Sequence, residues 1–305
     1  MTRRRRLIAD IGGTNARLGI ADDTGEIGDI RIVATSAYET FGDALSDYLE
    51  DVETAPAGAA VAIAGPVAGG EGRLVNGPWR FSCAGIAERL GSPDVRLLND
   101  LEAAALGVPS ARELSMIAST ALDVTRPIMT IGIGTGVGGA IRVPAANGAA
   151  LVVPTEAGHS LLPPLPRALP HDDGESAYSA EDLLSGRGLT ELYRLCGGGE
   201  VRDAAAVVAA LDGESLAAAL FRAAYAELLG RFAGNAALTT GARGGIAFIG
   251  GILPRLESRL DWGLFRRSFT GAGPMRDWLE AVPVALIADD MIALRGLASL
   301  DGGPA

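Results

Sequence analysis

Along the first third of the chain, short apolar segments that read as strands alternate with segments whose apolar residues recur at helical spacing. The predicted strands are residues 7–11, 16–21, 30–34, 59–63 and 95–98. A helix between the third and fourth strands has one apolar face, made by Phe41, Ala44, Leu45, Tyr48 and Leu49. Ser82 is placed to cap a second helix that carries Ile86 and Leu90. This order predicts a strand-rich α/β unit.

The same alternation of predicted strands and helices occurs again in the second part of the chain. Strands are predicted at residues 128–133, 138–143, 149–153, 246–249 and 282–288, and helices dominate residues 180–240. The longest predicted helix has a core stripe of Leu216, Leu220, Ala223, Ala224 and Leu228. A last helix is predicted at residues 291–300. Two such rounds predict two similar lobes that face each other, with the chain crossing between them near Pro109 and Asp289.

A turn that is nearly free of side chains follows the first predicted strand. Asp10 ends the apolar run, and Gly12, Gly13, Thr14 and Asn15 lead into the second strand. Backbone N–H groups exposed at such a tip can hold phosphate, so Gly13 is expected to lie too close to phosphate for a side chain. Asp10 is suited to a hydrated magnesium ion. An ordinary Gly-Gly hairpin is the alternative, and this segment alone does not decide between them.

A second glycine-rich turn follows the strand predicted at residues 128–133. Gly134, Gly136 and Gly139 match the GxGxxG pattern of dinucleotide sites, but such a site needs the turn to open a helix. Here the β-branched residues that follow continue as a strand, and the chain has no Walker sequence either. The turn of Gly134, Thr135 and Gly136 therefore reads as a second phosphate-binding hairpin tip.

A third glycine pair, Gly250 and Gly251, ends another apolar strand. Glycines there could let a flat base or a ribose lie against the backbone. Each turn is a weak signal by itself, but three of them at strand ends in both lobes favour a nucleotide bound between the lobes.

Asn99 and Asp100 stand where a buried strand gives way to a helix predicted to start at Leu101. The carboxyl ends of strands are where open α/β sheets place their ligands. The alternative role for Asp100 is a helix N-cap, and position alone slightly favours the cap.

Four more polar side chains stand in apolar surroundings: Asn76, Glu156, His159 and Glu181. Carboxylates, an amide and an imidazole suit a polyhydroxylated ligand, because each sugar hydroxyl both donates and accepts hydrogen bonds. The alternatives are a satisfied structural histidine at His159 and a favourable first-turn charge at Glu181, behind a Ser179 cap. No cysteine cluster stands near His159, so zinc has little support.

Composition and charge restrict the class of protein. The 305 residues suffice for two lobes, and 26 basic against 37 acidic residues give a net charge of −11, which disfavours a nucleic-acid partner. No apolar run is long enough to span a bilayer, and the basic residues 3–6 read as a solvated N-terminus. The cysteines, Cys83 and Cys196, are single and far apart, which fits a reducing cytoplasm. We expect a soluble cytoplasmic protein that binds neither nucleic acid nor membranes.

Eight motifs occur in the order and approximate spacing of the bacterial glucokinase family: DIGGTNARLG, AIAGPV, NGPW, LLNDLEAAALG, GIGTGVGG, EAGH, SAEDLLSGRGL and FIGGILPRL. The chain resembles this family over residues 8–300. The resemblance implies a two-lobed actin-like ATPase (ribonuclease H-like) α/β fold with a cleft between the lobes. The small lobe would be residues 1–110 completed by residues 290–305, and the large lobe residues 111–289. It also implies a homodimer that phosphorylates glucose to glucose 6-phosphate with ATP and magnesium.

The resemblance implies a role for each candidate residue. Asp100 would be the catalytic base, and Asp10 would hold magnesium through water. The residues that would bind the sugar are Asn76, Asn99, Asp100, Glu156, His159 and Glu181. The residues that would bind ATP are Asp10, Gly12, Gly13, Thr14, Asn15, Gly134, Thr135, Gly136, Gly250 and Gly251.

Three departures from the family pattern fall beside the expected sugar contacts. Ala157 stands where the family has glycine, and Arg187 where it has proline. The segment before Glu181 is short, and its prolines argue against a continuous helix: Pro163, Pro164, Pro166 and Pro170. Two alternatives to glucose phosphorylation therefore stay open, a kinase for another hexose or amino sugar and a non-catalytic sugar sensor.

Overall fold

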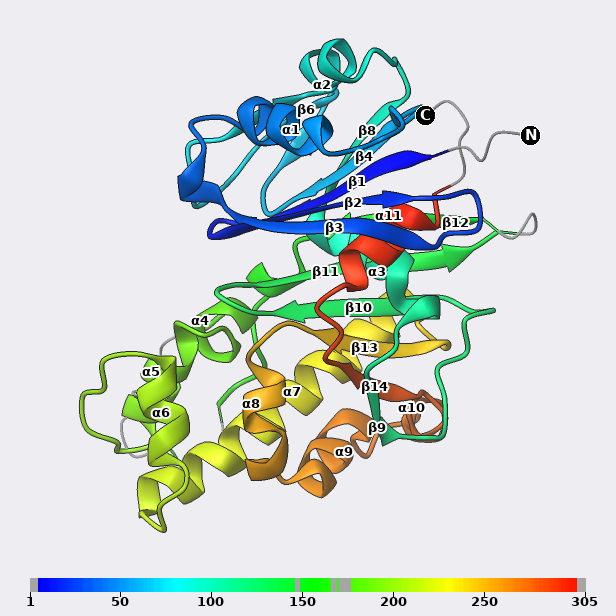
Figure 1. The fold of residues 1–305 in the computed structure, drawn as a ribbon. Helices are drawn as coiled ribbons and strands as arrows, with labels where there is room; N and C mark the ends of the chain where they lie inside the picture. The colour runs from blue at the N-terminus through cyan, green and yellow to red at the C-terminus, as the bar shows by residue number, and fades with distance from the viewer. Residues whose placement is uncertain (1–4, 146–148, 166–168, 170–176, 301–305) are drawn as a thin grey trace. The chain divides into compact units, whose positions relative to one another are not determined.

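The computed structural model describes residues 5–145, 149–165, 169 and 177–300, and it divides into two compact units (Figure 1). The first unit is Met1–Ala111 with Asp290–Ala305, and the second is Arg112–Asp289. Both units are mixed α/β structures, so the predicted α/β class is confirmed. None of the helices in the described part of the chain is long and apolar enough to cross a lipid bilayer.

A five-stranded mixed sheet forms the centre of the first unit, in the order β3-β2-β1-β4-β8 (Figure 1). The strands are β1 (Arg6–Ile11), β2 (Asn15–Ala21), β3 (Ile27–Ala34), β4 (Ala59–Ile63) and β8 (Val95–Asn99). β1 is antiparallel to β2, whereas β1, β4 and β8 run parallel, so their carboxyl ends lie at one edge of the sheet. All five strands predicted for this part of the chain are present.

Helices cover both faces of this sheet. α1 (Phe41–Glu50) and α2 (Cys83–Leu90) pack on the face that carries Leu7 and Ile11. The predicted Ser82 cap is present, because its Oγ accepts a hydrogen bond from the Gly85 N–H at 3.0 Å. A small antiparallel sheet adds β5 (Val67–Ala68), β6 (Glu71–Arg73) and β7 (Arg80–Ser82), and short 3-10 turns add η1 (Thr35–Ala37) and η2 (Val108–Ser110).

The C-terminal helix completes the first unit. α3 (Asp100–Gly107) and α11 (Ile292–Ala298) cover the sheet face that carries Ile8. Two glycines let these helices touch, since a Cβ at Gly107 would lie 2.0 Å from the Ile292 carbonyl oxygen and one at Gly296 would lie 1.7 Å from that of Ala103. Larger residues at either position would push the helices apart.

The N-terminal basic run is not simply solvated. Arg6 begins β1, and its guanidinium donates to the Leu300 carbonyl oxygen at 2.7 Å and to the Asp94 carboxylate at 3.1 Å. Arg5 pairs with Asp29. The prediction of a solvated N-terminus is therefore wrong for these two arginines, while residues 3 and 4 lie outside the described residues.

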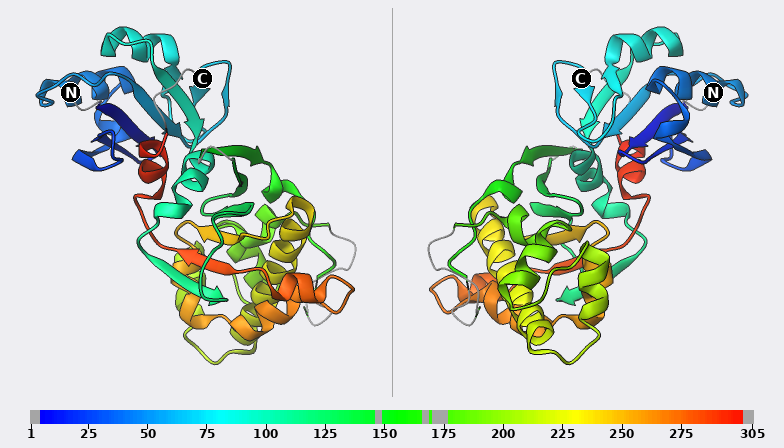
Figure 2. Two further views of the ribbon diagram at one scale, coloured as in Figure 1. Left: turned by 90° about the vertical axis from the view of Figure 1, so that its right-hand side faces the viewer. Right: turned by 90° about the vertical axis from the view of Figure 1, so that its left-hand side faces the viewer.

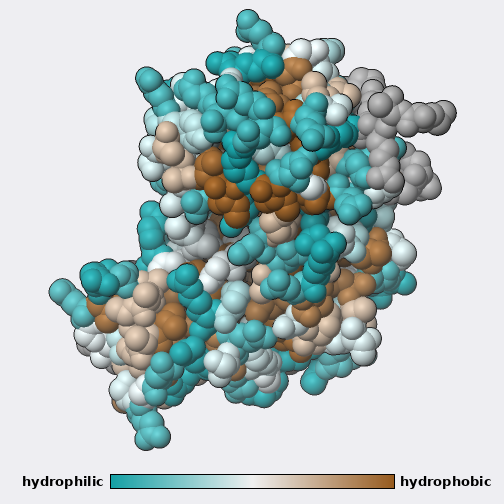
Figure 3. All heavy atoms as spheres, in the orientation of Figure 1, coloured by the Kyte–Doolittle hydropathy of each residue, from teal (hydrophilic) through white to brown (hydrophobic). Residues whose placement is uncertain are grey.

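β3 is an edge strand of the first sheet with one apolar face exposed. Ile30 and Ile32 both point to solvent, and Figure 3 shows apolar side chains gathered over this strand. The alternate residue Arg31 points to the opposite face, where its guanidinium lies over the Tyr48 ring. Successive side chains of the strand therefore alternate between the two faces, with the isoleucines on the exposed one.

A six-stranded mixed sheet forms the centre of the second unit, in the order β12-β11-β10-β13-β14-β9. The strands are β9 (Leu114–Ala118), β10 (Ile128–Ile133), β11 (Val137–Pro144), β12 (Ala150–Thr155), β13 (Gly245–Ile249) and β14 (Val284–Ile287). The five strands predicted here are present. β9 was not predicted, because this half-exposed edge strand lacks a continuous apolar run.

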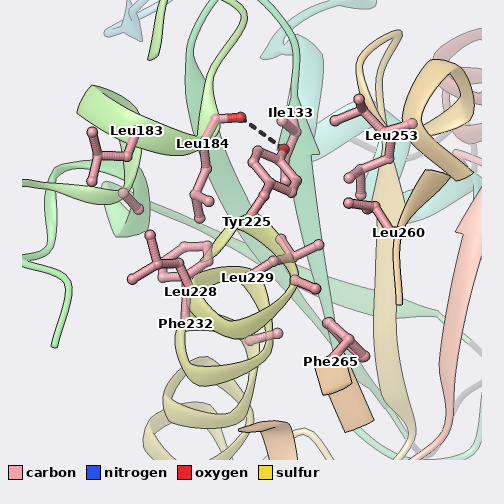
Figure 4. Packing of buried hydrophobic residues seen from close by; sticks show 14 of the residues in the cluster. Ile133, Leu183, Leu184, Tyr225, Leu228, Leu229, Phe232, Leu253, Leu260 and Phe265 are labelled. Atoms are coloured by element: carbon pink, nitrogen blue, oxygen red, sulfur yellow. Dashed lines mark hydrogen bonds between the residues drawn. The ribbon is translucent and has the colours of Figure 1, made fainter. Parts of the chain in front are cut away.

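One long helix organises the core of the second unit. Figure 2 shows α7 (Leu216–Thr240) beside α9 (Trp262–Thr270), and these two helices share an extensive contact. Figure 4 shows Tyr225 of α7 within the core, where its hydroxyl donates to the Leu184 carbonyl oxygen at 3.0 Å. The remaining helices are α4 (Ala180–Leu184), α5 (Gly188–Leu195), α6 (Ala204–Ala210), α8 (Leu253–Leu256) and α10 (Arg276–Glu280), with 3-10 turns η3 (Ala157–His159) and η4 (Glu257–Arg259).

The predicted core stripe of α7 is partly wrong. Ala224 and Leu228 are buried, but Leu216 is 74% exposed and Ala223 also faces solvent. The buried face instead begins at Ala218 and Phe221 and then widens. A stripe chosen by leucine spacing fails here because the alanine-rich sequence offers several faces of similar hydrophobicity.

Candidate active site

In the first unit, several segments meet at the carboxyl ends of the parallel strands. The Ala64 N–H donates to the Ile11 carbonyl oxygen at 2.9 Å, and the Val75 N–H donates to the Ala64 carbonyl oxygen at 3.1 Å. The Asn99 side-chain amide donates to the Gly65 carbonyl oxygen at 3.1 Å. The turn after β4 therefore holds together the turn after β1, the NGPW segment and the start of α3.

Asp10 and Asp100 bring two carboxylates into one electrostatic environment. Burial raises the pKa of Asp100 to about 6, and the nearby Asp10 charge adds to the shift. Burial also raises the pKa of Asp10, opposed by Arg17, whose Nη1 lies 3.5 Å from the Asp10 Oδ2. A cation would relieve the repulsion between these two acids.

Asp10 and Asp100 have the chemistry that a magnesium ion needs. Magnesium is commonly bound by one or two carboxylates, with water and substrate phosphate oxygens completing its octahedron. Over the residues that the structure describes, no group of three His, Cys, Asp or Glu side chains is placed to hold a metal by itself. The carboxylate pair therefore fits an ion that arrives with a phosphate ligand.

Asp100 is the first residue of α3 rather than its N-cap. Asn99 is the cap, and its Oδ1 accepts from the Leu101 N–H at 2.9 Å. Glu102 completes a capping box by accepting from the Asn99 N–H at 2.9 Å. The cap interpretation of Asp100 is therefore wrong, and part of the Asn99 amide is used to begin the helix.

The turn between β1 and β2 is a tight hairpin, closed by the Gly12 N–H donating to the Asn15 carbonyl oxygen at 2.9 Å. Gly13 and Thr14 are exposed at its tip. A Cβ added at Gly13 would lie 2.7 Å from the Asn76 carbonyl oxygen. The approach of the NGPW segment therefore requires glycine at this position, whatever binds at the tip.

Asn76 is exposed in a turn that a buried tryptophan anchors. Trp79 is 1% exposed, packs against Phe41 and Phe81, and donates from its indole nitrogen to the Tyr38 carbonyl oxygen at 3.2 Å. The apolar ring thus fixes the backbone that carries Asn76.

In the second unit, the glycine-rich turn between β10 and β11 contacts α4. The turn is closed by the Gly134 N–H donating to the Gly136 carbonyl oxygen at 2.9 Å. The next N–H, of Val137, donates to the Glu181 Oε2 at 3.0 Å. A Cβ at Gly136 would lie 2.6 Å from the same oxygen, whereas one at Gly134 would meet open space. Gly136 therefore accommodates a carboxylate, and Gly134 leaves room for a ligand.

The EAGH segment packs on the same turn. Gly158 is buried in η3, where a Cβ would lie 1.8 Å from the Val137 carbonyl oxygen. Glu156 and His159 are exposed, and the His159 Nε2 lies 4.0 Å from the Glu156 Oε2. Pro163 and Pro164 are not helical, as predicted, and Pro166 and Pro170 lie outside the described residues.

Gly250 and Gly251 have different surroundings at the end of β13. Gly250 has a φ of +99°, and a Cβ there would lie 2.4 Å from the Ile133 carbonyl oxygen. Gly251 faces open space. Gly250 is thus required by backbone conformation and packing, and Gly251 is free to meet a ligand.

Two arginines beside the site carboxylates were not predicted as site residues. Arg17 is the cross-strand partner of Asp10, a pairing that follows from counting outward from the hairpin turn. Arg187 donates from Nη2 to the Glu181 Oε1 at 2.9 Å. Its replacement of a family proline was noted, but no spacing rule predicts that it reaches Glu181.

Comparisons with known proteins find similarity over nearly the whole chain. A family model described as Glucokinase matches residues 7–301. A glucokinase from Chromobacterium violaceum is 39% identical over 96% of this chain and 88% of its own length. One from Nitrobacter hamburgensis is 36% identical, over 97% of this chain and 96% of its own. The crystal structure of a glucokinase from an Antarctic psychrotroph superimposes with a TM-score of 0.87 at 30% identity, covering 97% of this chain and 98% of that one.

Proposed function

The chain belongs to the glucokinase family, and from that premise we propose that it transfers the γ-phosphoryl group of ATP to the 6-hydroxyl of glucose, with Asp100 as general base. The observation that carries this proposal is the Asp100 carboxylate, which begins α3 at the carboxyl edge of the first sheet, where burial and the nearby Asp10 charge raise its pKa to about 6. A base with a pKa near the working pH is ionised there and still accepts a proton well.

Asp100 accepts the proton of the sugar 6-hydroxyl as the hydroxyl oxygen attacks the γ-phosphorus of ATP. Asp100 follows β8 at the same carboxyl edge of the first sheet as the β1–β2 hairpin, where Gly13, Thr14 and Asn15 would offer donors to phosphate oxygens and the Gly12 N–H closes the turn. Asp10 would hold magnesium through water. When bound, the ion neutralises charge on the transferring phosphoryl group.

Glucose is held by side chains that pair with its hydroxyls. These are Asn76, Asn99 and Asp100 of the first unit and Glu156, His159 and Glu181 of the second. ATP is held by the β1–β2 hairpin and by Gly134, Thr135, Gly136, Gly250 and Gly251. The two units are the lobes of an actin-like ATPase fold. The protein works as a homodimer in the cytoplasm.

The test is a coupled assay of ADP release with glucose, mannose, fructose and glucosamine at saturating ATP and magnesium. We expect glucose to give the highest kcat/KM. A higher kcat/KM for another sugar would identify a kinase of different specificity, a possibility raised by Ala157 and Arg187 beside the sugar contacts. Glucose binding by calorimetry without any ADP release would identify a sugar sensor.

The Asp100→Asn variant tests the base. We expect its kcat to fall by about 10²- to 10⁴-fold, with glucose affinity within about tenfold of wild type. Asp123→Asn, the same change at an exposed aspartate of the second unit, is the control and should retain full activity. Normal kcat in Asp100→Asn would refute the assignment.

A further inference from the structure

Glu181 is held by two different parts of the second unit. Its Oε2 accepts from the Val137 N–H at 3.0 Å, and its Oε1 accepts from the Arg187 Nη2 at 2.9 Å. Val137 follows the glycine-rich turn, and Arg187 precedes α5. The carboxylate thus joins the turn proposed for phosphate to the segment between α4 and α5.

The two partners are unequal in exposure. The Glu181 side chain is 22% exposed and the Arg187 side chain 78% exposed. An exposed arginine gains little from a surface ion pair by itself. The Glu181 carboxylate, however, is mostly buried, and its Oε2 already accepts from the Val137 N–H. The Arg187 guanidinium therefore adds a second hydrogen bond to a carboxylate whose orientation is already restricted.

The backbone reinforces the same contact. The Gly186 N–H donates to the Gly134 carbonyl oxygen at 2.7 Å, which places Arg187 directly beside the turn. The positive charge of Arg187 also contributes to lowering the pKa of Asp182, although the Ser179 hydrogen bonds are the larger cause. The backbone hydrogen bond thus keeps Arg187 next to Glu181 at the start of α4.

We infer that Arg187 is a positioning residue for the sugar, because it holds the Glu181 carboxylate in one orientation against the glycine-rich turn. This inference rests on the proposed sugar-binding role of Glu181. With one oxygen occupied by Arg187 and the other shared with Val137, Glu181 can accept from sugar hydroxyls in few directions. Arg187 consequently narrows which hexoses bind, a role that the proline of the family pattern cannot fill.

The family's own residue provides a clean test. Arg187 has a φ of −70°, which proline adopts without strain, so Arg187→Pro removes the guanidinium and keeps the backbone. Arg187→Gln removes the charge and shortens the side chain, and Arg187→Lys keeps a cation. Arg194→Gln is the matched control, since Arg194 is an exposed arginine of α5 that pairs with Glu191.

The experiment measures glucose affinity by calorimetry without nucleotide, and the KM values of glucose, mannose and ATP. We expect Arg187→Pro and Arg187→Gln to weaken glucose binding about three- to tenfold and to reduce the preference for glucose over mannose. The KM of ATP should stay unchanged, Arg187→Lys should recover part of the glucose affinity, and Arg194→Gln should match wild type.

A double variant separates the roles that Arg187 could have. In the Glu181→Ala background, removing Arg187 should cost no further glucose affinity, because the side chain that Arg187 holds is already gone. A rise in the KM of ATP with unchanged glucose affinity would overturn the inference and assign Arg187 to the phosphates. Unchanged values for both substrates would overturn it as well. A folded wild-type protein that binds no sugar would instead overturn the proposed function, and with it any sugar-positioning role.

Discussion

Asp100 is held between opposing influences on its charge. As the first residue of α3 it accepts from the Leu101 N–H at 3.0 Å, and this hydrogen bond favours the ionised form. Burial and the nearby Asp10 favour the neutral form more strongly, so the pKa rises from 3.8 to about 6. A carboxylate of ordinary pKa would be a weaker base at neutral pH.

The pH dependence of activity follows from this pKa. Asp100 must be ionised to accept a proton, so activity should be lost as the pH falls. We expect kcat/KM to decline about tenfold per pH unit below about 6. Bound magnesium favours the ionised acid, so the acid limb of kcat should lie at lower pH than that of kcat/KM. A kcat/KM that stays flat to pH 5 would contradict the assignment.

Because its pKa is raised, Asp100 destabilises the folded protein at neutral pH. The folded pKa lies above the unfolded value of 3.8, so the folded state is relatively favoured below that value and loses this advantage as the pH rises through about 6. At pH 7 in a chelator, Asp100→Asn should therefore raise the free energy of unfolding by roughly 1–3 kcal/mol. Urea unfolding at pH 7 and pH 4 checks this, because the gain should disappear at the lower pH.

The matched control for that measurement is Asp123→Asn. Hydrogen bonds from Thr125 lower the pKa of Asp123, the opposite direction to Asp100, so this variant should gain no stability at pH 7. An equal gain in both variants would attribute the effect to net charge, which is already strongly negative.

At the scale of elements, the hairpin between β1 and β2 contacts the NGPW segment and is also the proposed phosphate-binding turn. A Cβ at Gly13 would lie 2.7 Å from the Asn76 carbonyl oxygen, so a side chain there must move the NGPW segment. We therefore expect Gly13→Ala to raise the KM of glucose as well as that of ATP, each by at least about threefold.

Gly134→Ala is the control for Gly13→Ala. A Cβ at Gly134 would meet no other part of the protein within 4 Å, so glucose affinity should stay unchanged. The KM of ATP should rise, because the Cβ would enter the space proposed for phosphate. Steady-state kinetics with each substrate varied in turn measure both effects. Normal glucose affinity in Gly13→Ala would show that the NGPW segment does not depend on this contact.

The strands were predictable where burial forces a continuous apolar run. β4 and β10 are buried throughout and contain few polar residues, so their limits follow from composition alone. The sequence does not predict β9, because β9 is a half-exposed edge strand. It predicts a partly wrong buried face for α7, because alanines occur on several faces of that helix and none is clearly the most hydrophobic. Patterns along the chain thus predict elements best where only one packing is possible.

At the scale of the whole molecule, the candidate site was predictable as a set of residues but not as a set of contacts. Asp10, Asn99 and Asp100 lie at or next to the ends of parallel strands, which bring them to one edge, and the hydrogen bond from Val75 to Ala64 brings the Asn76 turn to the same edge. The link between Arg187 and Glu181 depends on how two helices end and begin, which no periodicity encodes. Side-chain partners across turns therefore follow from the three-dimensional structure and not from the sequence pattern.

The chain begins and ends in the same unit, and this connection makes the last prediction specific. α11 places Leu294 and Leu297, both fully buried, on the sheet face of Ile8, Ala60 and Ala62. Ending the chain after Asp289 would expose that face and remove about 4–5 kcal/mol of apolar burial from these two leucines alone, a large share of the stability of a domain.

We expect loss of activity and proteolysis of the first unit, with a fragment near residues 112–289 that persists because its core is separate. Limited proteolysis with mass spectrometry checks this, with a chain ended after Leu300 as the control that keeps α11 and full activity. Equal protease resistance of both truncated chains would show that the first unit does not need its C-terminal helix.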